Sequence, residues 1–134
     1  MTYYLDSNIL IFVLRGTNRK LAEKIDSTYD NEIKIPSVVM AELIEGAYAS
    51  RDAERNIEQV IEYLDSFELI PFGRDAAMIC GRIGAGLMAE GRKIGSNDLM
   101  IAATVMSRNG VLVTNNTKEF GRIEGLRLED WTKV

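Results

Sequence analysis

Short apolar runs alternate along the chain with longer segments in which apolar residues recur every three or four positions. The short runs predict strands, and the longer segments predict helices. The predicted strands are 3–5, 33–35, 68–71, 111–114 and 126–128, and the predicted helices are 9–14, 18–29, 37–50, 53–67, 75–90, 96–106 and a turn at 118–120. Because strands that alternate with helices pair in parallel, this order predicts a three-layer α/β/α sandwich around a central, mostly parallel sheet.

Polar side chains stand where several helices are expected to begin or end. Asn18, Ser37 and Ser96 precede apolar helical patterns and are of the types that cap helix amino ends. The second helix is expected to carry Tyr29 on its apolar face and to end at Asp30-Asn31-Glu32. These residues set the expected helix boundaries.

No strand is predicted between helices 37–50 and 53–67, so we expect them to form an αα-hairpin excursion from the sandwich. The inward side of the second helix is expected to consist of Ile57, Val60, Ile61 and Leu64. The helix 75–90 contains Gly81, Gly84 and Gly86. Because these glycines do not follow a strand, they indicate close helix packing and not a phosphate-binding loop.

The chain has the size and composition of one globular domain, which we expect to span residues 1–134. It has 134 residues, of which 46% are hydrophobic and 27% are charged. No apolar run approaches the roughly 18 residues that cross a bilayer, and no signal peptide pattern is present. We therefore expect a cytoplasmic protein without membrane association. The single Cys80 lies in an apolar helical pattern, where we expect a buried thiol without catalytic use.

The chain contains no histidine, and this absence limits its chemistry more than any other feature of the composition. It excludes serine and cysteine catalysis that depends on histidine, and it removes most zinc sites. Catalysis would have to rest on carboxylates, whose hard oxygen atoms suit Mg²⁺ or Mn²⁺. The net charge of −4 argues against a sequence-independent nucleic-acid coat, but it is compatible with a nuclease whose metal ions offset the acids.

Acidic residues follow or flank the predicted strands at positions where a parallel sheet gathers its chemistry. Asp6 follows the first strand, Glu42 lies within an otherwise apolar helix, and Asp98 stands at a helix start. A fourth candidate segment, 114–119, follows a late strand. Asp6 could serve only as a helix cap, and Asp98 could serve only to complement a helix dipole. Convergence of all these segments in one place would favour the functional alternative.

These segments resemble the PIN-domain family, and the match is closest to the VapC-type toxin ribonucleases of bacterial toxin–antitoxin pairs. The resemblance covers nearly the whole chain in four blocks. The blocks are Asp6-Ser7-Asn8, Met40-Ala41-Glu42-Leu43, Gly95-Ser96-Asn97-Asp98-Leu99 and the segment from Thr114-Asn115-Asn116 to Leu128-Glu129-Asp130-Trp131. It implies a PIN-like sandwich that hydrolyses RNA phosphodiester bonds and leaves 5′-phosphate and 3′-hydroxyl ends.

The resemblance also implies roles for individual residues. Asp6 and Asp98 would hold Mg²⁺, or alternatively Mn²⁺, and Glu42 would act through water; these three are the expected catalytic residues. Weaker or supporting roles are expected for Ser7, Asn8, Asn97, Thr114, Asn116 and Glu119. Two positions depart from the family pattern. Ser7 replaces the usual threonine, and Asn116 stands where many PIN domains carry a fourth acid.

Partners follow from the same resemblance. The RNA substrate would be held through its phosphates by Arg92, Lys93, Lys118 and Arg122, although charged loop residues are also commonly just solvated. A VapB-like antitoxin would cover the acidic cleft, and the chain would form a homodimer. Tyr48 and Tyr63 offer apolar surface for a partner, with internal packing as the alternative.

Two other functions are compatible with the residues. Asn116 allows a catalytically impaired PIN-fold binding module, because it removes one acid from the set. A magnesium-binding receiver or phosphotransfer domain would also cluster acids at the ends of parallel strands. The absence of a second acid beside Asp6 and of a lysine at a strand end disfavours the receiver.

Overall fold

The structure is a computed structural model that describes residues 1–28 and 32–133. Its centre is a five-stranded parallel sheet with strand order β3-β2-β1-β4-β5. The strands are β1 (Tyr3–Leu5), β2 (Ile33–Pro36), β3 (Glu68–Ile70), β4 (Val111–Val113) and β5 (Arg127–Glu129). The predicted parallel sheet is confirmed, and β5 lies one residue later than expected.

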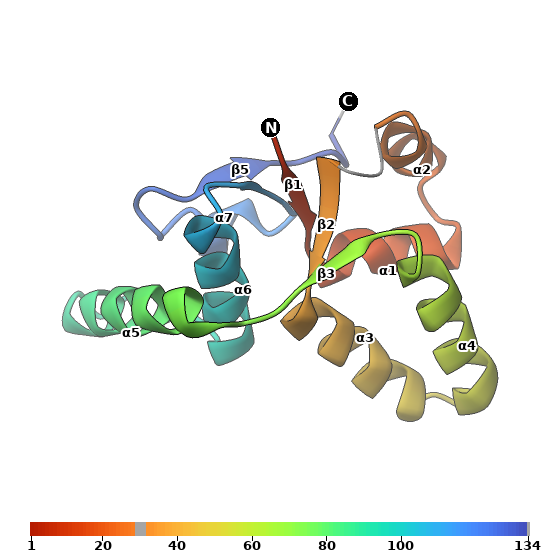
Figure 1. Cartoon of the computed structure of the whole chain (residues 1–134), viewed down its shortest axis with the longest axis horizontal. Helices are drawn as coiled ribbons and strands as arrows, with labels where there is room; N and C mark the ends of the chain where they lie inside the picture. The colour runs from red at the N-terminus through yellow and green to blue at the C-terminus, as the bar shows by residue number, and fades with distance from the viewer. Residues whose placement is uncertain (29–31, 134) are drawn as a thin grey trace.

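Helices cover both faces of this sheet (Figure 1). They are α1 (Ser7–Arg15), α2 (Arg19–Asp26), α3 (Ser37–Tyr48), α4 (Ala53–Leu64), α5 (Arg74–Ala89), α6 (Ser96–Ser107) and α7 (Thr117–Phe120). In Figure 1, α1, α2 and α4 lie to one side of the strands, and α5, α6 and α7 lie to the other. The three-layer α/β/α architecture is therefore confirmed. No helix in the described residues combines the length and apolarity needed to cross a bilayer.

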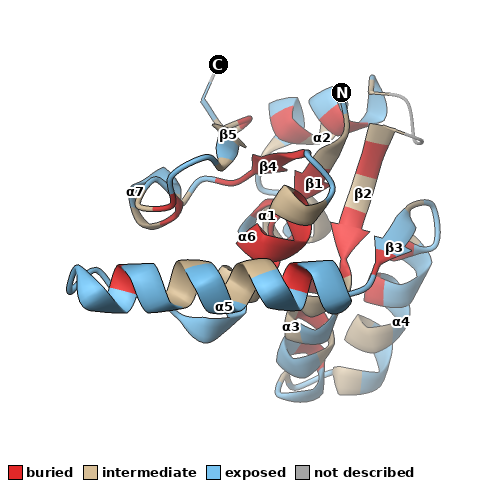
Figure 2. Ribbon diagram, turned by 60° about the vertical axis from the view of Figure 1, so that its left-hand side comes forward, coloured by how far each residue is buried: buried red, intermediate tan, exposed pale blue. Residues whose placement is uncertain are grey.

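Burial is concentrated in the inner strands and in α6 (Figure 2). All three residues of β4 are buried, and so is every residue from 101 to 105 in α6. A helix that is apolar on all sides has to be enclosed by the fold, and α6 packs against α5, β2 and β4. The apolar pattern of 96–106 thus predicted a central helix correctly.

The strand order brings the carboxyl ends of β1 and β4 side by side. Tyr3 is paired with Val111 and Leu5 with Val113. After β1 the chain enters α1 on one face, whereas after β4 it enters α7 on the other face (Figure 1). Such a switch point between neighbouring parallel strands is where open α/β sheets bind their ligands. The sequence from β2 continues into α3, and α3 packs against α4 as the predicted αα-hairpin.

Two of the three expected helix caps are wrong. Asn18 caps α2, because its side chain accepts a hydrogen bond from the Leu21 amide at 3.0 Å. Ser37 and Ser96, in contrast, are the first residues of α3 and α6, and neither helix has a side-chain cap at its own N-cap residue. The Ser37 hydroxyl instead accepts a hydrogen bond from the Phe72 amide. The cap prediction failed because Ser37 serves a contact between distant segments.

Other local predictions also need correction. Ile61 was expected to face inward on α4, but it is 47% exposed. Of the α5 glycines, Gly84 packs closely, since an added Cβ would lie 2.9 Å from Leu99 Cδ2, whereas Gly81 and Gly86 face open space. Cys80 is only half-buried. The predicted position of Tyr29 and most of the predicted helix end at 30–32 lie outside the described residues.

Gly110 provides a test of the core at the start of β4. A Cβ at this position would lie 2.4 Å from Cε1 of the buried Tyr4 and 3.2 Å from the Thr2 carbonyl oxygen. We expect Gly110→Ala to lower the free energy of unfolding by about 1–3 kcal/mol through overpacking, as measured by urea denaturation. Gly81→Ala, in open space on a helix, is the control and should be neutral or stabilising by up to about 1 kcal/mol. Equal stability of the two variants would contradict this packing.

Candidate active site

Asp6 occupies the turn between β1 and α1 and is only 4% exposed. Its amide donates to the Val113 carbonyl at 3.0 Å, so the backbone is fixed to the neighbouring strand β4. The side-chain Oδ1 accepts a hydrogen bond from the Ser7 amide at 2.8 Å, which makes Asp6 the N-cap of α1. Its Oδ2 accepts from the buried Thr114 hydroxyl at 2.7 Å. Asp6 is therefore both a helix cap and a member of a larger polar group.

Glu42 approaches Asp6 from α3 and is half-buried on an otherwise apolar helix. The Ser7 hydroxyl donates to Glu42 Oε1 at 2.5 Å. From α6, the Asn97 side-chain amide donates to Glu42 Oε2 at 3.4 Å. These contacts compensate for the partial burial of the carboxylate and hold Glu42 between α1 and α6.

Asp98 lies in the first turn of α6 and shares a hydrogen bond with Glu119 of α7. Glu119 also accepts a hydrogen bond from the Gly95 amide at 3.1 Å and one from the Asn116 side-chain amide at 2.9 Å. Glu119 thus satisfies the amide of the residue that precedes α6. Sequence patterns could not predict this hydrogen bond, because its acceptor is on another helix 24 residues away.

The four carboxylates influence one another electrostatically, which shows that they lie in one region. Burial, followed by the charges of Asp6, Glu119 and Glu42, raises the pKa of Asp98 to about 7. Burial also raises the pKa of Asp6, while the hydrogen bonds from Thr114 and Ser7 counteract this effect. The amide of Gly95 and the side chain of Asn116 lower the pKa of Glu119. Glu119 is therefore the more acidic member of its pair with Asp98.

The supporting residues that the sequence suggested lie around these acids. Asn8 is exposed and donates to the Asn115 side chain at 3.4 Å. Asn116 closes a turn, since its amide donates to the Thr114 hydroxyl at 3.0 Å. Asn115 was not among the predicted site residues. It lies within the candidate segment 114–119, and this was the signal that could have indicated it.

The four basic side chains that were predicted to bind RNA make fewer contacts with the protein than the acids do. Arg92, Lys93 and Lys118 have exposed side chains. Arg122 is half-buried, and its Nη1 donates to the Lys93 carbonyl at 3.2 Å. Arg122 therefore fastens the loop before α6 to the segment after α7, in addition to any contact with a substrate.

The acids fit a hard divalent cation that keeps much of its water shell. In the described part of the chain, no group of three acidic or cysteine side chains is arranged to hold a metal ion by itself. Mg²⁺, however, usually takes only one or two protein carboxylates, together with water and substrate phosphates. Asp6 and Asp98 supply two such groups, and a cation would offset the burial and the like charge that raise the pKa of both.

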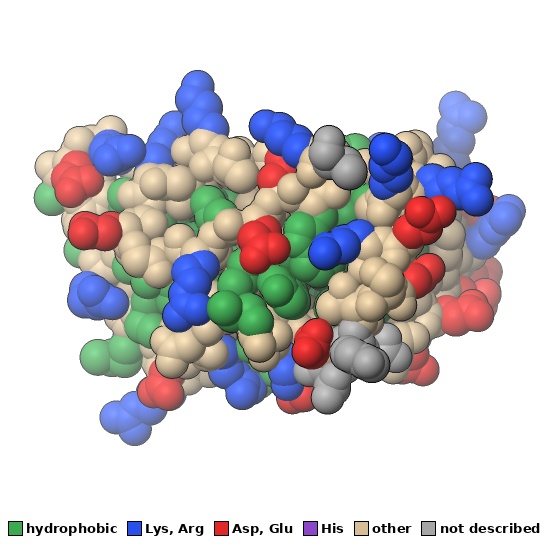
Figure 3. All heavy atoms as spheres, turned by 90° about the horizontal axis from the view of Figure 1, so that it is seen from above, with side chains coloured by type: hydrophobic (Ala, Val, Ile, Leu, Met, Phe, Trp, Pro, Cys, Tyr) green, Lys and Arg blue, Asp and Glu red, His purple; other side chains and the backbone are tan. Residues whose placement is uncertain are grey.

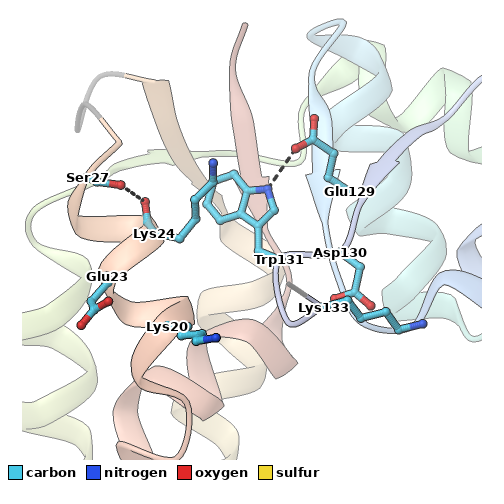
Figure 4. A pocket seen from close by; sticks show the side chains of 8 residues that line it. All are labelled: Lys20, Glu23, Lys24, Ser27, Glu129, Asp130, Trp131 and Lys133. Atoms are coloured by element: carbon cyan, nitrogen blue, oxygen red, sulfur yellow. Dashed lines mark hydrogen bonds between the residues drawn. The ribbon is translucent and has the colours of Figure 1, made fainter.

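One cavity lies away from the acids. It measures about 640 Å³ and surrounds Trp131, over whose ring the Lys24 ammonium lies 5.3 Å from the centroid (Figure 4). The face at the amino ends of the strands intersperses acidic and basic side chains around hydrophobic atoms (Figure 3). A smaller cavity, about 280 Å³, lies between α1, α3 and α4, with Glu42 at its border. This smaller cavity adjoins the site through Glu42.

Comparison with known proteins identifies the family. The model of the PIN domain matches residues 3–126. The chain belongs to the PIN-domain family. This PIN domain is 35% identical to ribonuclease VapC1 of Haemophilus influenzae over 99% of its own length and 100% of the relative's. It is 36% identical to the tRNA(fMet)-specific endonuclease VapC of Shigella flexneri, over 98% and 99% of the two chains.

Its fold is also that of solved VapC-type structures. The crystal structure of DNA-bound VapBC from Salmonella typhimurium superposes on this PIN domain with a TM-score of 0.92. The two chains are 36% identical, and the match covers 98% of each. Within the PIN family, the chain therefore belongs with the VapC-type proteins.

The raised pKa of Asp98 predicts a pH dependence of the metal-free PIN domain. Between an ordinary aspartate pKa of 3.8 and the folded value of about 7, the folded state binds more protons than the unfolded state. The free energy of unfolding should therefore fall as pH rises through this window. Urea denaturation in a chelator at pH 5 and pH 7.5 measures the change. Asp98→Asn should flatten the dependence, and an unchanged slope in that variant would contradict the assignment.

The Thr114 hydroxyl provides a second test, because it is buried and bonded to Asp6. Thr114→Val should destabilise the domain by about 1–3 kcal/mol at neutral pH and raise the pKa of Asp6 further. The control is Thr104→Val, since the equally buried Thr104 hydroxyl donates only to the Met100 carbonyl within α6. We expect the control to lose less than about 1 kcal/mol. Carboxyl NMR titration and urea denaturation would reveal the difference, and equal effects would contradict it.

Proposed function

We propose that this chain is a VapC-type endoribonuclease that hydrolyses RNA phosphodiester bonds with the help of a divalent metal ion. The observation that carries the proposal is the meeting of Asp6, Glu42, Asp98 and Glu119, from four separate segments, at the switch point of the sheet. The named ribonuclease relatives support the RNA substrate. We also propose that residues 1–134 work as one domain, located in the cytoplasm where RNA substrates are present.

Mg²⁺ is the proposed cofactor, with Mn²⁺ as the alternative of similar oxygen chemistry. Asp6 and Asp98 would hold the cation. When bound there, a divalent cation lowers the pKa of a water molecule and stabilises charge that develops on the phosphate. The Thr114 hydroxyl and the Ser7 amide fix the orientation of the Asp6 carboxylate in advance. This orientation reduces the reorganisation required during the reaction.

Glu42 is the proposed residue that positions the attacking water. Its Oε1 is held by the Ser7 hydroxyl and its Oε2 by the weaker contact with Asn97. Glu42 Oε2 therefore remains the better placed oxygen to accept a hydrogen bond from water, and to take a proton as the water attacks. The serine at position 7 keeps the hydroxyl that the family usually supplies from threonine, so the departure preserves this contact.

Asn116 removes one acidic side chain from the site but does not reduce it to three acids. Its side-chain amide donates to Glu119 Oε2, and its neutral oxygen adds no charge. Glu119, from the next turn of chain, supplies the fourth carboxylate of the cluster. We therefore propose an active nuclease in preference to an impaired binding module.

A VapB-like antitoxin is the proposed partner, in line with the VapBC complexes among the structural relatives. The cavity between α1, α3 and α4 offers apolar walls from Ile11, Leu14 and Val60, with Glu42 at its border. An antitoxin segment with apolar side chains and one basic side chain matches this surface. We also propose a homodimer, because Tyr48 and Leu69 remain 69% and 42% exposed and offer apolar surface to a second copy.

A cleavage assay on total RNA tests the proposed function. The parent protein should cut RNA with Mg²⁺, lose activity in a chelator, and leave 5′-phosphate and 3′-hydroxyl ends. Asp6→Asn and Asp98→Asn should abolish cleavage, and Glu42→Gln should lower the rate by about a hundredfold or more. The matched control is Glu45→Gln, an exposed acid one turn further along α3, which should cut like the parent. Metal-independent cutting, or full activity of the folded Asp6 and Asp98 variants, would overturn the proposal.

A further inference from the structure

A third cavity, about 460 Å³ in volume, lies beside the acids on the α5 side of the molecule. It is formed by the second half of α5, the loop before α6 and the segment after α7. Three guanidinium groups line it, those of Arg82, Arg92 and Arg122. Its volume falls within the range of about 300–1,000 Å³ that is usual for ligand sites.

The charges of this cavity are available to a ligand. In the described part of the chain, the ion pairs within 4.0 Å are Arg19–Glu23 and Lys34–Glu68, so no carboxylate lies that close to the three arginines. Glu90 and Glu124 also line the cavity and leave an excess of one positive charge. Guanidinium groups bind phosphate oxygens through paired hydrogen bonds, which makes a phosphodiester a suitable ligand.

Arg122 connects this cavity to the acids. Its guanidinium lines the cavity and donates to the Lys93 carbonyl, and its charge lowers the pKa of Glu119. Glu119 in turn is hydrogen-bonded to Asp98. This cavity, which we call the arginine cavity after Arg82, Arg92 and Arg122, is therefore adjacent to the acidic cluster, with Arg122 between them.

We propose that the arginine cavity binds a backbone phosphate of the RNA strand next to the bond that is cut. This proposal rests on the proposed ribonuclease function and adds Arg82 and α5 to the substrate surface. A chain with a net charge of −4 and four clustered acids repels RNA at the site itself, so local cations must hold the flanking strand. The apolar side chains Ile83, Leu87 and Ile123 provide a floor for the sugar and base.

An acidic side chain of an antitoxin would offer similar oxygen atoms to the arginines. The adjacency to the acidic cluster favours RNA, because a continuous polyanion can place one phosphate at Asp98 and the next ones at Arg122 and Arg82. Binding of the antitoxin alone would require no such continuity. RNA binding and antitoxin retention, measured on the same variants, distinguish the two ligands.

The test uses variants that change the charge of the cavity while sparing the fold. Arg82→Gln and Arg92→Gln each remove one positive charge, and Arg74→Gln is the control, an exposed arginine of α5 outside the cavity. Gly86 lines the cavity in open space, so Gly86→Glu adds a negative charge there. Gly86→Lys adds a side chain of similar size with the opposite charge and is the matched control.

Binding of a fluorescent mixed-sequence single-stranded RNA is measured by anisotropy across a salt series. All variants carry Asp98→Ala, so that no RNA is cut during the measurement. Arg82→Gln and Arg92→Gln should each weaken binding about tenfold and reduce the slope of log affinity against log salt by about 0.7. Gly86→Glu should also weaken binding, whereas Gly86→Lys and Arg74→Gln should bind RNA at least as well as the reference.

The outcomes separate this proposal from the proposed function. Failure of the parent protein to cut RNA would overturn the function, while the binding series would still test the cavity. Cleavage by the parent together with unchanged salt slopes in the cavity variants would overturn the cavity proposal alone. If the cavity variants kept their RNA affinity but retained a co-expressed antitoxin less well, the cavity would be assigned to the antitoxin. This result would also overturn the cavity proposal.

Discussion

Mutual repulsion among four carboxylates is the constraint on which this structure depends. Asp6, Glu42, Asp98 and Glu119 come together at the carboxyl ends of the strands, where burial and like charge raise the pKa of Asp6 and of Asp98. The fold tolerates the cluster because three of the acids accept a hydrogen bond from a donor in another segment: Thr114 for Asp6, Ser7 for Glu42 and the Gly95 amide for Glu119. For the remaining acid, Asp98, burial and the neighbouring charges raise the pKa to about 7. The cluster of carboxylates therefore favours the binding of a cation.

The same hydrogen bonds connect the chemistry to the architecture. The Asp6 carboxylate caps α1 and contacts the residue after β4, so the acid joins the two strands of the switch point. Ser7 and Asn97 connect α3 to α1 and α6. Removal of one donor would therefore affect both stability and the orientation of an acid. In this protein, the polar network of the site is also part of the packing between layers.

The sequence predicted what depends on local pattern and on strand order. Alternating apolar runs were sufficient for the parallel sheet, the central α6 and the αα-hairpin, and the family motifs indicated Asp6, Glu42 and Asp98. Contacts between distant segments were not predictable in this way. Ser37 and Ser96 fit the cap pattern, yet the hydroxyl of Ser37 accepts from the Phe72 amide, and before α6 it is the amide of Gly95 that is bonded, to Glu119. The arginine cavity joins residues from three segments, and no spacing in the sequence relates Arg82 to Arg122.

Trp131 is the only tryptophan in the chain and comes two residues after β5. It is 8% exposed, and its indole NH donates to Glu129 at 3.0 Å while its ring packs against Tyr3. An indole enclosed in this way fluoresces differently once water reaches it. Its emission therefore follows the detachment of the carboxyl-terminal segment from β1 and α2. Trp131 contacts Tyr3, the first residue of β1, whereas Asp6 follows the last, so the protein carries a single fluorescent reporter of folding outside the residues proposed to hold metal and RNA.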